Sequence, residues 1–332
     1  MRHAANWHPR AARRKRESAR GLHDAAAPAQ NAPRQGHGGD HVRTEPTRAM
    51  SGTLLSIGHG YSARALAADL LARGWRVIAT TRSAEKAGVL RGEGVEAIVW
   101  PGSDLSEPLA QATHLLSSVP PGAEGDPVLA GPGESIAAAR HLAWVGYLST
   151  TGVYGDHGGA TVDEDTPLAP TTERGARRVA AEQGWQAACA RAGVALHVFR
   201  LAGIYGPGRN AVERVRAGTA RRIVKPGQVF SRIHVADIAQ VLAASMAAPV
   251  PGGRVYNVCD DMPAPPQDLI THAAALIGVA PPPEEDFEDA ELSPMARSFY
   301  AESKRVGNAR IKRELGVTLR YPDYRAGLAA LV

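Results

Sequence analysis

A glycine-rich segment at residues 58–63 reads G-H-G-Y-S-A, which is the spacing of a loop that holds a dinucleotide. Gly58 would permit the tight turn, and Gly60 would let the backbone approach a pyrophosphate without a Cβ atom in the way. The N–H groups of the helical turn that follows would face the phosphates, and the helix dipole would favour their charge. The alternative is a turn that serves packing alone. The contacts expected in this loop come from Gly58, Gly60, Tyr61, Ser62 and Ala63.

The end of the next strand distinguishes the two nicotinamide dinucleotides. An NAD site usually carries an acidic residue about 20 residues after the loop, where it accepts a hydrogen bond from the ribose 2′-hydroxyl. Here Thr81, Arg82 and Ser83 occupy that place, and the next carboxylate is Glu85. No acidic group repels a 2′-phosphate, and an arginine binds phosphate in a fork geometry. The segment therefore favours NADP(H), with NAD(H) possible, unless Arg82 is only a solvated surface arginine.

Two later strand ends carry hydroxyl groups. The segment at residues 117–119 (S-S-V) ends one predicted strand, and the segment at 149–155 (S-T-T-G-V-Y-G) ends the next. Ligands of parallel α/β sheets bind outside the carboxyl ends of the strands. Both segments are therefore expected at the same crevice, although each could also be a polar turn that ends a strand. The residues expected to reach the ligand are Ser117, Ser118, Val119 and Thr150.

Alternating strands and helices position these segments. Apolar runs predict strands at residues 53–57, 75–80, 96–100, 114–119, 144–150 and 195–201, and helical periodicity predicts helices at 63–73, 134–142 and 172–192. Strands separated by helices predict an α/β fold, a Rossmann doubly wound parallel sheet with helices on both faces. We expect this nucleotide-binding domain over residues 50–202. A smaller substrate-side lobe over 203–332, interleaved with the Rossmann core, would contain a Pro/acidic loop at 281–286 and a C-terminal helix.

The first 49 residues differ in composition from the rest. They hold ten Lys/Arg and four Asp/Glu, which leaves 28 basic and 29 acidic residues for the remainder of the chain. The segment has neither the apolar core of a secretory signal nor enough apolar surface to fold alone. We therefore expect a disordered basic leader that ends before Met50. A transit peptide and a basic arm that touches nucleic acid are the alternatives.

Composition also excludes several classes of protein. The two cysteines lie in unrelated contexts, which argues against a disulfide framework or a zinc site and suits a reducing compartment. We therefore expect a cytoplasmic protein without a metal. No apolar run is long enough to span a membrane. Because the charge beyond the leader is nearly balanced, we expect no nucleic-acid partner.

Several ordered segments make the chain resemble the extended short-chain dehydrogenase/reductase superfamily, the group that includes NAD-dependent epimerases and dehydratases. The matching segments are GHGYSARA at 58–65, STTGVYG at 149–155, FRLAGIYGPGR at 199–209, RIHVADIA at 232–239, VYNVCDD at 255–261 and KRVGNARIKRELG at 304–316. They cover about residues 53–330. The fold and the dinucleotide site inferred above are those that the resemblance implies.

The resemblance also implies roles for single residues. Thr150 matches the catalytic Ser/Thr of the family, whose hydroxyl binds the reacting oxygen, and Tyr205 would lie beside the nicotinamide. His234 and Asp237 match a segment that ties the small lobe to the crevice, or they begin and cap a helix. Tyr154 is expected to project toward the nicotinamide pocket, where it would either pack against the substrate or act as a general acid.

One family feature is absent. The tyrosine acid and the lysine, spaced Y-x-x-x-K, should open the long helix, yet Arg174 and Arg178 stand at those places. Arginine does not release its proton near neutral pH, so Arg174 cannot simply replace the tyrosine. Arg178 could still hold a ribose or lower the pKa of Tyr154. Glu173 and His157 are the other candidate acids.

The sequence therefore predicts an atypical NAD(P)-dependent oxidoreductase, or an epimerase or dehydratase, that lacks the usual Tyr-x-x-x-Lys pair. Its partner would be a small carbonyl compound or a sugar-nucleotide-like substrate, and it would be a monomer or a homodimer. The alternative is a non-catalytic NADP(H)-binding sensor or scaffold. The intact segments around Thr150 and Tyr205 favour the enzyme, and the missing pair favours the sensor.

Overall fold

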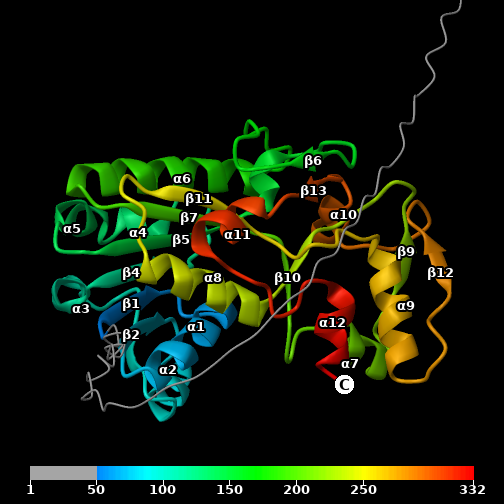
Figure 1. Ribbon diagram of the computed structural model, residues 1–332, viewed down its shortest axis with the longest axis horizontal. Coiled ribbons are helices and arrows are strands. Elements are labelled where there is room, and N and C mark those ends of the chain that lie inside the picture. The colour runs from blue at the N-terminus through cyan, green and yellow to red at the C-terminus, as the bar shows by residue number, and fades with distance from the viewer. Residues whose placement is uncertain (1–50) are drawn as a thin grey trace, which may run out of the picture. The chain divides into compact units, whose positions relative to one another are not determined.

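The computed structural model describes residues 51–332, and a parallel sheet of seven strands forms its centre (Figure 1). In hydrogen-bonding order the strands are β11 (Arg254–Val258), β7 (Leu196–Leu201), β5 (Trp144–Thr150), β4 (His114–Ser117), β1 (Thr53–Ile57), β2 (Arg76–Thr81) and β3 (Glu96–Val99). Every neighbouring pair is parallel. The predicted α/β fold of the Rossmann type is confirmed.

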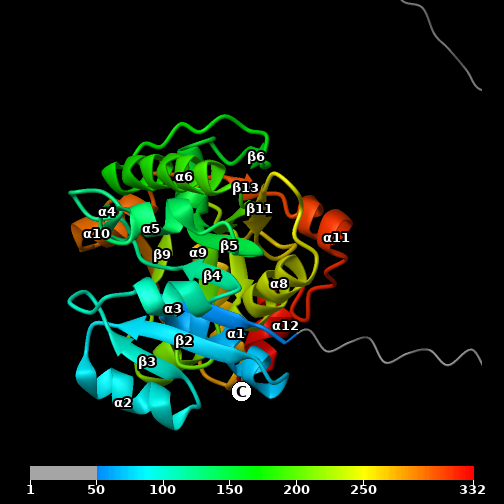
Figure 2. The same ribbon diagram turned by 90° about the vertical axis from the view of Figure 1, so that its left-hand side faces the viewer.

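Helices cover both faces of the sheet (Figures 1 and 2). One face packs against α1 (Tyr61–Ala72), α2 (Ala84–Gly92) and α8 (Val235–Ala247). The other packs against α3 (Ser106–Gln111), α4 (Pro127–Ala130), α5 (Gly133–Ala138) and α6 (Glu173–Ala192). The strands are buried on both sides, which explains their continuous apolar sequences. No helix within residues 51–332 has the length and apolar character needed to cross a membrane.

The longest helix, α6, has clear signals at both ends. Thr172 precedes it, and the Thr172 Oγ1 accepts a hydrogen bond from the N–H of Gly175 at 3.1 Å. Gly193 ends the helix in the left-handed conformation, with φ of 69°. Trp185, on the buried side, donates its indole N–H to Asp126 Oδ2 at 2.9 Å. The helix therefore begins beside the carboxyl end of β5 and is anchored along its length.

The later part of the chain adds small sheets and helices beside the main sheet (Figure 1). A 3₁₀ turn, η1 (Thr151–Tyr154), follows β5. Two-stranded parallel sheets pair β8 (Gly203–Tyr205) with β10 (Arg232–His234), β9 (Arg222–Val224) with β12 (Glu284–Asp286), and β6 (Thr161–Val162) with β13 (Arg305–Val306). The additional helices are α7 (Ala211–Arg216), α9 (Pro266–Leu276), α10 (Pro294–Phe299), α11 (Ala309–Leu315) and α12 (Tyr324–Ala329).

One local prediction was wrong. The Pro/acidic segment at 281–286 was expected to be a loop throughout, but residues 284–286 form β12. The three prolines lack the N–H that a strand ladder requires, so pairing begins only at Glu284. Exposed carboxylates then alternate along the strand, and Glu284 and Glu285 form ion pairs with Arg222 and Arg221 of the neighbouring segment.

A buried ion pair joins α6 to the sheet. Arg200 of β7 donates two hydrogen bonds to the carboxylate of Glu182, from Nη2 at 2.8 Å and from Nε at 3.2 Å. Both side chains are less than 10% exposed. The hydroxyl of Ser149, in β5, donates to the same carboxylate. Each charge is thus satisfied without water, a condition that a buried pair must meet to be tolerated.

We expect Glu182→Gln to destabilise the protein, because it leaves the Arg200 guanidinium buried without an opposite charge. Breaking a buried pair costs about 3–5 kcal/mol, which lowers Tm by roughly 6–20 °C at 2–4 °C per kcal/mol. Thermal unfolding followed by circular dichroism would measure this change. The control is Glu134→Gln, which breaks an exposed pair with Arg191 and should leave Tm nearly unchanged. Equal melting temperatures for the two variants would contradict the conclusion that Glu182 and Arg200 form a buried, stabilising pair.

Candidate functional site

The glycine-rich loop between β1 and α1 has the geometry that its sequence predicts. Gly58 has φ of 78°, a conformation that side chains disfavour, and a Cβ atom there would lie 2.5 Å from Val119 Cγ2. Ser118 donates its hydroxyl to the carbonyl oxygen of Gly58. Ser118 and Val119 thus lie against the loop, and their contact with a ligand stays a prediction. In this structure their contacts shape the loop itself.

The loop is also tied to the end of β2. Gly58 donates its N–H to Thr80 Oγ1 at 2.9 Å, and His59 donates its N–H to the Thr80 carbonyl oxygen at 3.0 Å. The backbone of His59 therefore lies beside the strand end where the ribose 2′ position of a bound dinucleotide is expected.

The N-terminus of α1 is open to a ligand. Gly60 occupies the cap position, no side chain caps the helix, and its first turn contains no acidic residue. By contrast, the hydroxyls of Ser83 and Thr172 cap α2 and α6. A Cβ atom at Gly60 would meet nothing within 4 Å except the Gly58 carbonyl oxygen at 3.7 Å. Uncapped N–H groups above open space are what a phosphate requires, so the residues present fit a dinucleotide pyrophosphate.

The end of β2 presents one cation to solvent. Thr81 is buried, and its carbonyl oxygen accepts the N–H of Trp100 at 2.8 Å. Arg82 is exposed, and within residues 51–332 its guanidinium forms neither a hydrogen bond nor an ion pair. The Ser83 hydroxyl accepts the N–H of Lys86 at 3.2 Å and so begins α2. Of these three predicted residues, Arg82 is the one with an uncommitted side chain.

The expectation that Ser117 reaches the ligand was wrong. Ser117 is completely buried, and its Oγ has no hydrogen-bond partner in the described part of the chain. β4 is buried on both faces, so a side chain at its last position points into the packed interior.

Thr150 lies at the carboxyl end of β5 and is partly exposed. Its Oγ1 accepts the N–H of Gly152 at 3.2 Å, which leaves the hydroxyl proton available for another acceptor. Helix α6 approaches this turn closely, because a Cβ atom at Gly175 would lie 2.8 Å from the Gly152 carbonyl oxygen. The absence of a side chain at Gly175 thus brings the start of α6 next to Thr150.

Tyr154 does not project into the crevice. It is 0% exposed, its hydroxyl donates to Asn257 Oδ1 at 2.7 Å, and it accepts from Arg200 Nη1 at 3.0 Å. Burial raises the pKa of Tyr154 despite the neighbouring Arg200. A buried phenol with a raised pKa and two internal partners is not placed to protonate a substrate, so this prediction was wrong. Arg178, expected to lower that pKa, lies elsewhere.

The arginines at the start of α6 differ in their surroundings. Arg178 Nη1 donates to the Tyr147 hydroxyl at 3.0 Å and to the Leu148 carbonyl oxygen at 2.9 Å, so this nitrogen is used within the fold. Arg174 is exposed, with its guanidinium carbon 4.5 Å from the centre of the Phe299 ring. Of the alternative acids, Glu173 pairs with Arg177, and His157 Nε2 lies 3.1 Å from the Tyr154 carbonyl oxygen.

Three residues implied by the resemblance have structural contacts. His234 caps α8, with its Nδ1 accepting the N–H of Ala236 at 3.2 Å. Asp237 accepts the N–H groups of Arg320 and Tyr321 at 2.7 and 3.1 Å, which ties α8 to the C-terminal segment. Tyr205 was expected beside the nicotinamide, but it is 5% exposed and donates to the Asp323 carbonyl oxygen at 3.3 Å. Tyr205 therefore packs against α12.

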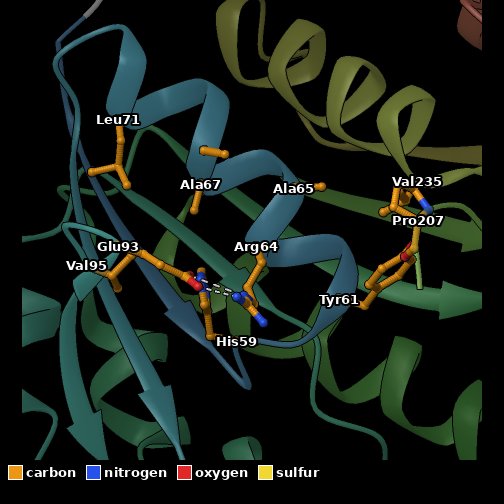
Figure 3. A pocket seen from close by; sticks show the side chains of 11 residues that line it. His59, Tyr61, Arg64, Ala65, Ala67, Leu71, Glu93, Val95, Pro207 and Val235 are labelled. Carbon is orange, nitrogen blue, oxygen red and sulfur yellow. Dashed lines mark hydrogen bonds and ion pairs between the residues drawn. The ribbon is translucent and has the colours of Figure 1, made fainter. Parts of the chain in front are cut away.

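A pocket beside α1 contains residues that sequence reasoning missed (Figure 3). Its volume is about 390 Å³, and the ion pair of Arg64 with Glu93 crosses it. His59 lies at its base, with Nδ1 2.9 Å from Ser56 Oγ. At its other end, Tyr61 donates its hydroxyl to the Pro207 carbonyl oxygen at 2.8 Å. Among residues 51–332 no cluster of three or more His, Cys, Asp or Glu side chains could hold a metal ion.

Comparison with known proteins agrees with this geometry. Residues 134–259 match the model of the NAD dependent epimerase/dehydratase family. A solved structure of a functionally unknown conserved protein from Silicibacter pomeroyi DSS is 60% identical, with 84% of this chain and 98% of that chain covered and a TM-score of 0.79. This chain belongs to the NAD-dependent epimerase/dehydratase family. The superfamily resemblance predicted from the sequence is confirmed.

Other relatives of this epimerase/dehydratase family member are more distant. Protein YeeZ of Escherichia coli (strain K12) is 29% identical over 289 residues, which cover 80% of this chain and 95% of that protein. UDP-glucuronic acid 4-epimerase from Bacillus cereus, solved in complex with NAD, is 17% identical, covers 84% of this chain and 95% of its own, and has a TM-score of 0.68. The second likeness shows the fold alone.

We expect Tyr154→Phe to lower the free energy of unfolding. It leaves Asn257 Oδ1 and Arg200 Nη1 buried without this partner, at a cost of about 1–3 kcal/mol. The control is Tyr256→Phe, because the Tyr256 hydroxyl is buried without a hydrogen-bond partner among the described residues and its removal should cost little. Thermal unfolding would compare the variants. A Tyr154→Phe protein with unchanged Tm, but with turnover reduced about 10²-fold or more, would restore the catalytic interpretation.

Proposed function

We propose that this protein binds NADP(H), with its pyrophosphate at the N-terminus of α1, and uses it in oxidation and reduction at a carbonyl carbon. The uncapped first turn of α1 beside Gly60 carries the proposal, because its N–H groups face open space and its dipole favours an anion. The family to which the chain belongs is described as NAD dependent. When bound, the nicotinamide supplies reversible hydride transfer.

The substrate class follows from the distant relatives and from the strand ends. The Bacillus cereus relative is a UDP-glucuronic acid 4-epimerase, and another structural neighbour is a UDP-N-acetylglucosamine 4-epimerase. In our proposal a small carbonyl compound or a sugar-nucleotide-like compound lies above β5. Thr150 donates its free hydroxyl proton as a hydrogen bond to the reacting oxygen. Arg174 supplies positive charge where the family has a tyrosine, and the proton itself comes from solvent.

A second candidate function is a non-catalytic NADP(H)-binding sensor or scaffold. The observation that favours it is that neither Tyr154 nor Tyr205 presents its hydroxyl to a substrate: Tyr154 is buried with two internal partners, and Tyr205 packs against α12. Arg178 Nη1 is likewise used within the fold. A protein with this arrangement would respond to the dinucleotide without turning it over.

The choice of NADP(H) over NAD(H) rests on Arg82. We expect Arg82→Ala to weaken NADPH binding about 10- to 150-fold, because a hydrogen bond to a charged group contributes about 1.5–3 kcal/mol, and to leave NADH binding nearly unchanged. Titration of nicotinamide fluorescence would measure both affinities. Arg140→Ala is the matched control, since Arg140 is also exposed but precedes the opposite end of β5. Equal losses for the two cofactors would mean that Arg82 only supports the fold.

The two candidate functions predict different outcomes in a turnover assay. The purified protein is mixed with NADPH and a panel of carbonyl compounds and sugar nucleotides, and the absorbance of the reduced nicotinamide is followed. Thr150→Val, which removes the hydroxyl and keeps the shape of the side chain, is the matched variant. Oxidation of NADPH that depends on substrate and on Thr150 supports the enzyme. Tight NADPH binding without turnover of any compound supports the sensor or scaffold.

A further inference from the structure

The pocket beside α1 places an unpartnered polar group next to an ion pair. His59 is 2% exposed, and its Nε2 is buried without a hydrogen-bond partner in the described residues. The ring lines the same pocket as Arg64 and Glu93 (Figure 3). A ligand atom bound in the pocket would give this nitrogen a hydrogen-bond partner.

One backbone hydrogen bond connects the base of this pocket with the end of β2. The His59 N–H donates to the carbonyl oxygen of Thr80, the second-last residue of β2, and Arg82 follows two residues later. The end of β2 is where a Rossmann fold holds the ribose 2′ position. His59, Arg64, Lys86 and Glu93 are close enough for the three charged groups to influence the pKa of His59. Of these charged groups, Arg64 and Glu93 line the pocket.

We propose that Arg64 exchanges the carboxylate of Glu93 for the 2′-phosphate of NADP(H), with His59 Nε2 as a further contact to that phosphate. This inference rests on the proposed binding of NADP(H). It makes the pocket of His59, Arg64 and Glu93 a specificity site for the phosphate monoester, distinct from the pyrophosphate site at Gly60.

Because the Arg64–Glu93 ion pair is exposed to solvent, replacing it with a contact to phosphate costs little free energy. The side chains of Arg64 and Glu93 are 44% and 38% exposed, and an ion pair in water contributes little to stability. A phosphate dianion accepts charge-assisted hydrogen bonds from the same guanidinium fork and carries more charge than a carboxylate. Glu93 therefore holds Arg64 in a binding geometry while the site is free, and it yields to the stronger acceptor.

His59 contributes a hydrogen bond without adding charge. Burial, together with the neighbouring Arg64, lowers its pKa to about 4, so the ring is neutral at pH 7. In the tautomer in which the Ser56 hydroxyl donates to Nδ1, the proton lies on Nε2 and is available to a phosphate oxygen. Selectivity for the phosphate then comes from Arg64 and Arg82.

The test measures the affinities of the full chain for NADPH and NADH by nicotinamide fluorescence. We expect Arg64→Gln to lower the affinity for NADPH about tenfold and to change the affinity for NADH by less than about twofold. Glu93→Gln should raise the affinity for NADPH about threefold or more, because the competing carboxylate is gone. The affinity for NADH should not change. In the double variant the effect of Glu93→Gln should vanish, because it acts only through Arg64.

Matched controls come from the other ion pair on the same helix. Arg73 and Asp69 form an exposed pair at the far end of α1, so Arg73→Gln and Asp69→Asn should leave both affinities unchanged. Adenosine 2′,5′-bisphosphate and adenosine 5′-monophosphate, used as displacers, test the adenosine end directly. Arg64→Gln should weaken the first and spare the second. Melting temperatures confirm that each variant is folded.

The outcomes separate this inference from the proposed function. If the wild type binds neither nucleotide, both fail. If it binds NADPH and responds to Arg82→Ala, but Arg64→Gln changes the two affinities equally or not at all, only the exchange is overturned. An unchanged or weaker NADPH affinity in Glu93→Gln also overturns it. Opposite effects of the two single variants on NADPH alone establish it.

Discussion

The buried pairing of Glu182 with Arg200 is the interaction on which the geometry of the site depends. Two charges are removed from water, which is costly unless every oxygen and nitrogen finds a partner. The bidentate contact, the Ser149 hydroxyl and the Tyr154 hydroxyl provide those partners. The group connects α6 with β5 and β7, and through Asn257 it reaches β11. The first turn of α6, which carries Arg174, is therefore held in register with the strand ends.

This use of polar side chains also keeps Tyr154 from replacing the tyrosine that the sequence lacks at the start of α6. Tyr154 satisfies a buried arginine and a buried asparagine. Gly175 is likewise committed to a close approach between α6 and the turn after β5. In the first turn of α6, the exposed guanidinium of Arg174 lies over the Phe299 ring. The site is therefore positively charged where the family usually has a neutral phenol, and both candidate functions have to accommodate that difference.

The fold was largely predictable, whereas the contacts of single polar side chains were not. Strands such as β1 (TLLSI) and β4 (HLLS) have consecutive apolar residues that point to both faces, and this pattern predicts a parallel sheet covered by helices. The same run of apolar residues gave no sign of where the Ser117 side chain points. A strand buried on both sides has no alternation of polar and apolar residues from which exposure can be inferred. The inward direction of Tyr154 depends on Arg200, 46 residues away, and no local pattern records that pairing.

The pocket beside α1 was missed for a related reason. His59 was visible inside the glycine motif, but its type is not part of that motif, and Glu93 follows α2 without any motif of its own. A signal was nevertheless present in the sequence: a histidine between two loop glycines, followed five residues later by an arginine. The ion pair between Arg64 and Glu93 arises only when α1 and α2 pack side by side on the sheet.

The hydrogen bond from Tyr61 to the Pro207 carbonyl oxygen has a thermodynamic consequence. It joins the first residue of α1 to the loop after β8, and Gly206 in that loop leaves room for the Tyr61 hydroxyl only because it lacks a side chain. If α1 shifts when an anion binds, either this hydrogen bond lengthens or the loop, 146 residues along the chain, moves with the helix. Such coupling is reciprocal: a ligand held by the loop would alter the affinity for the dinucleotide by the same factor.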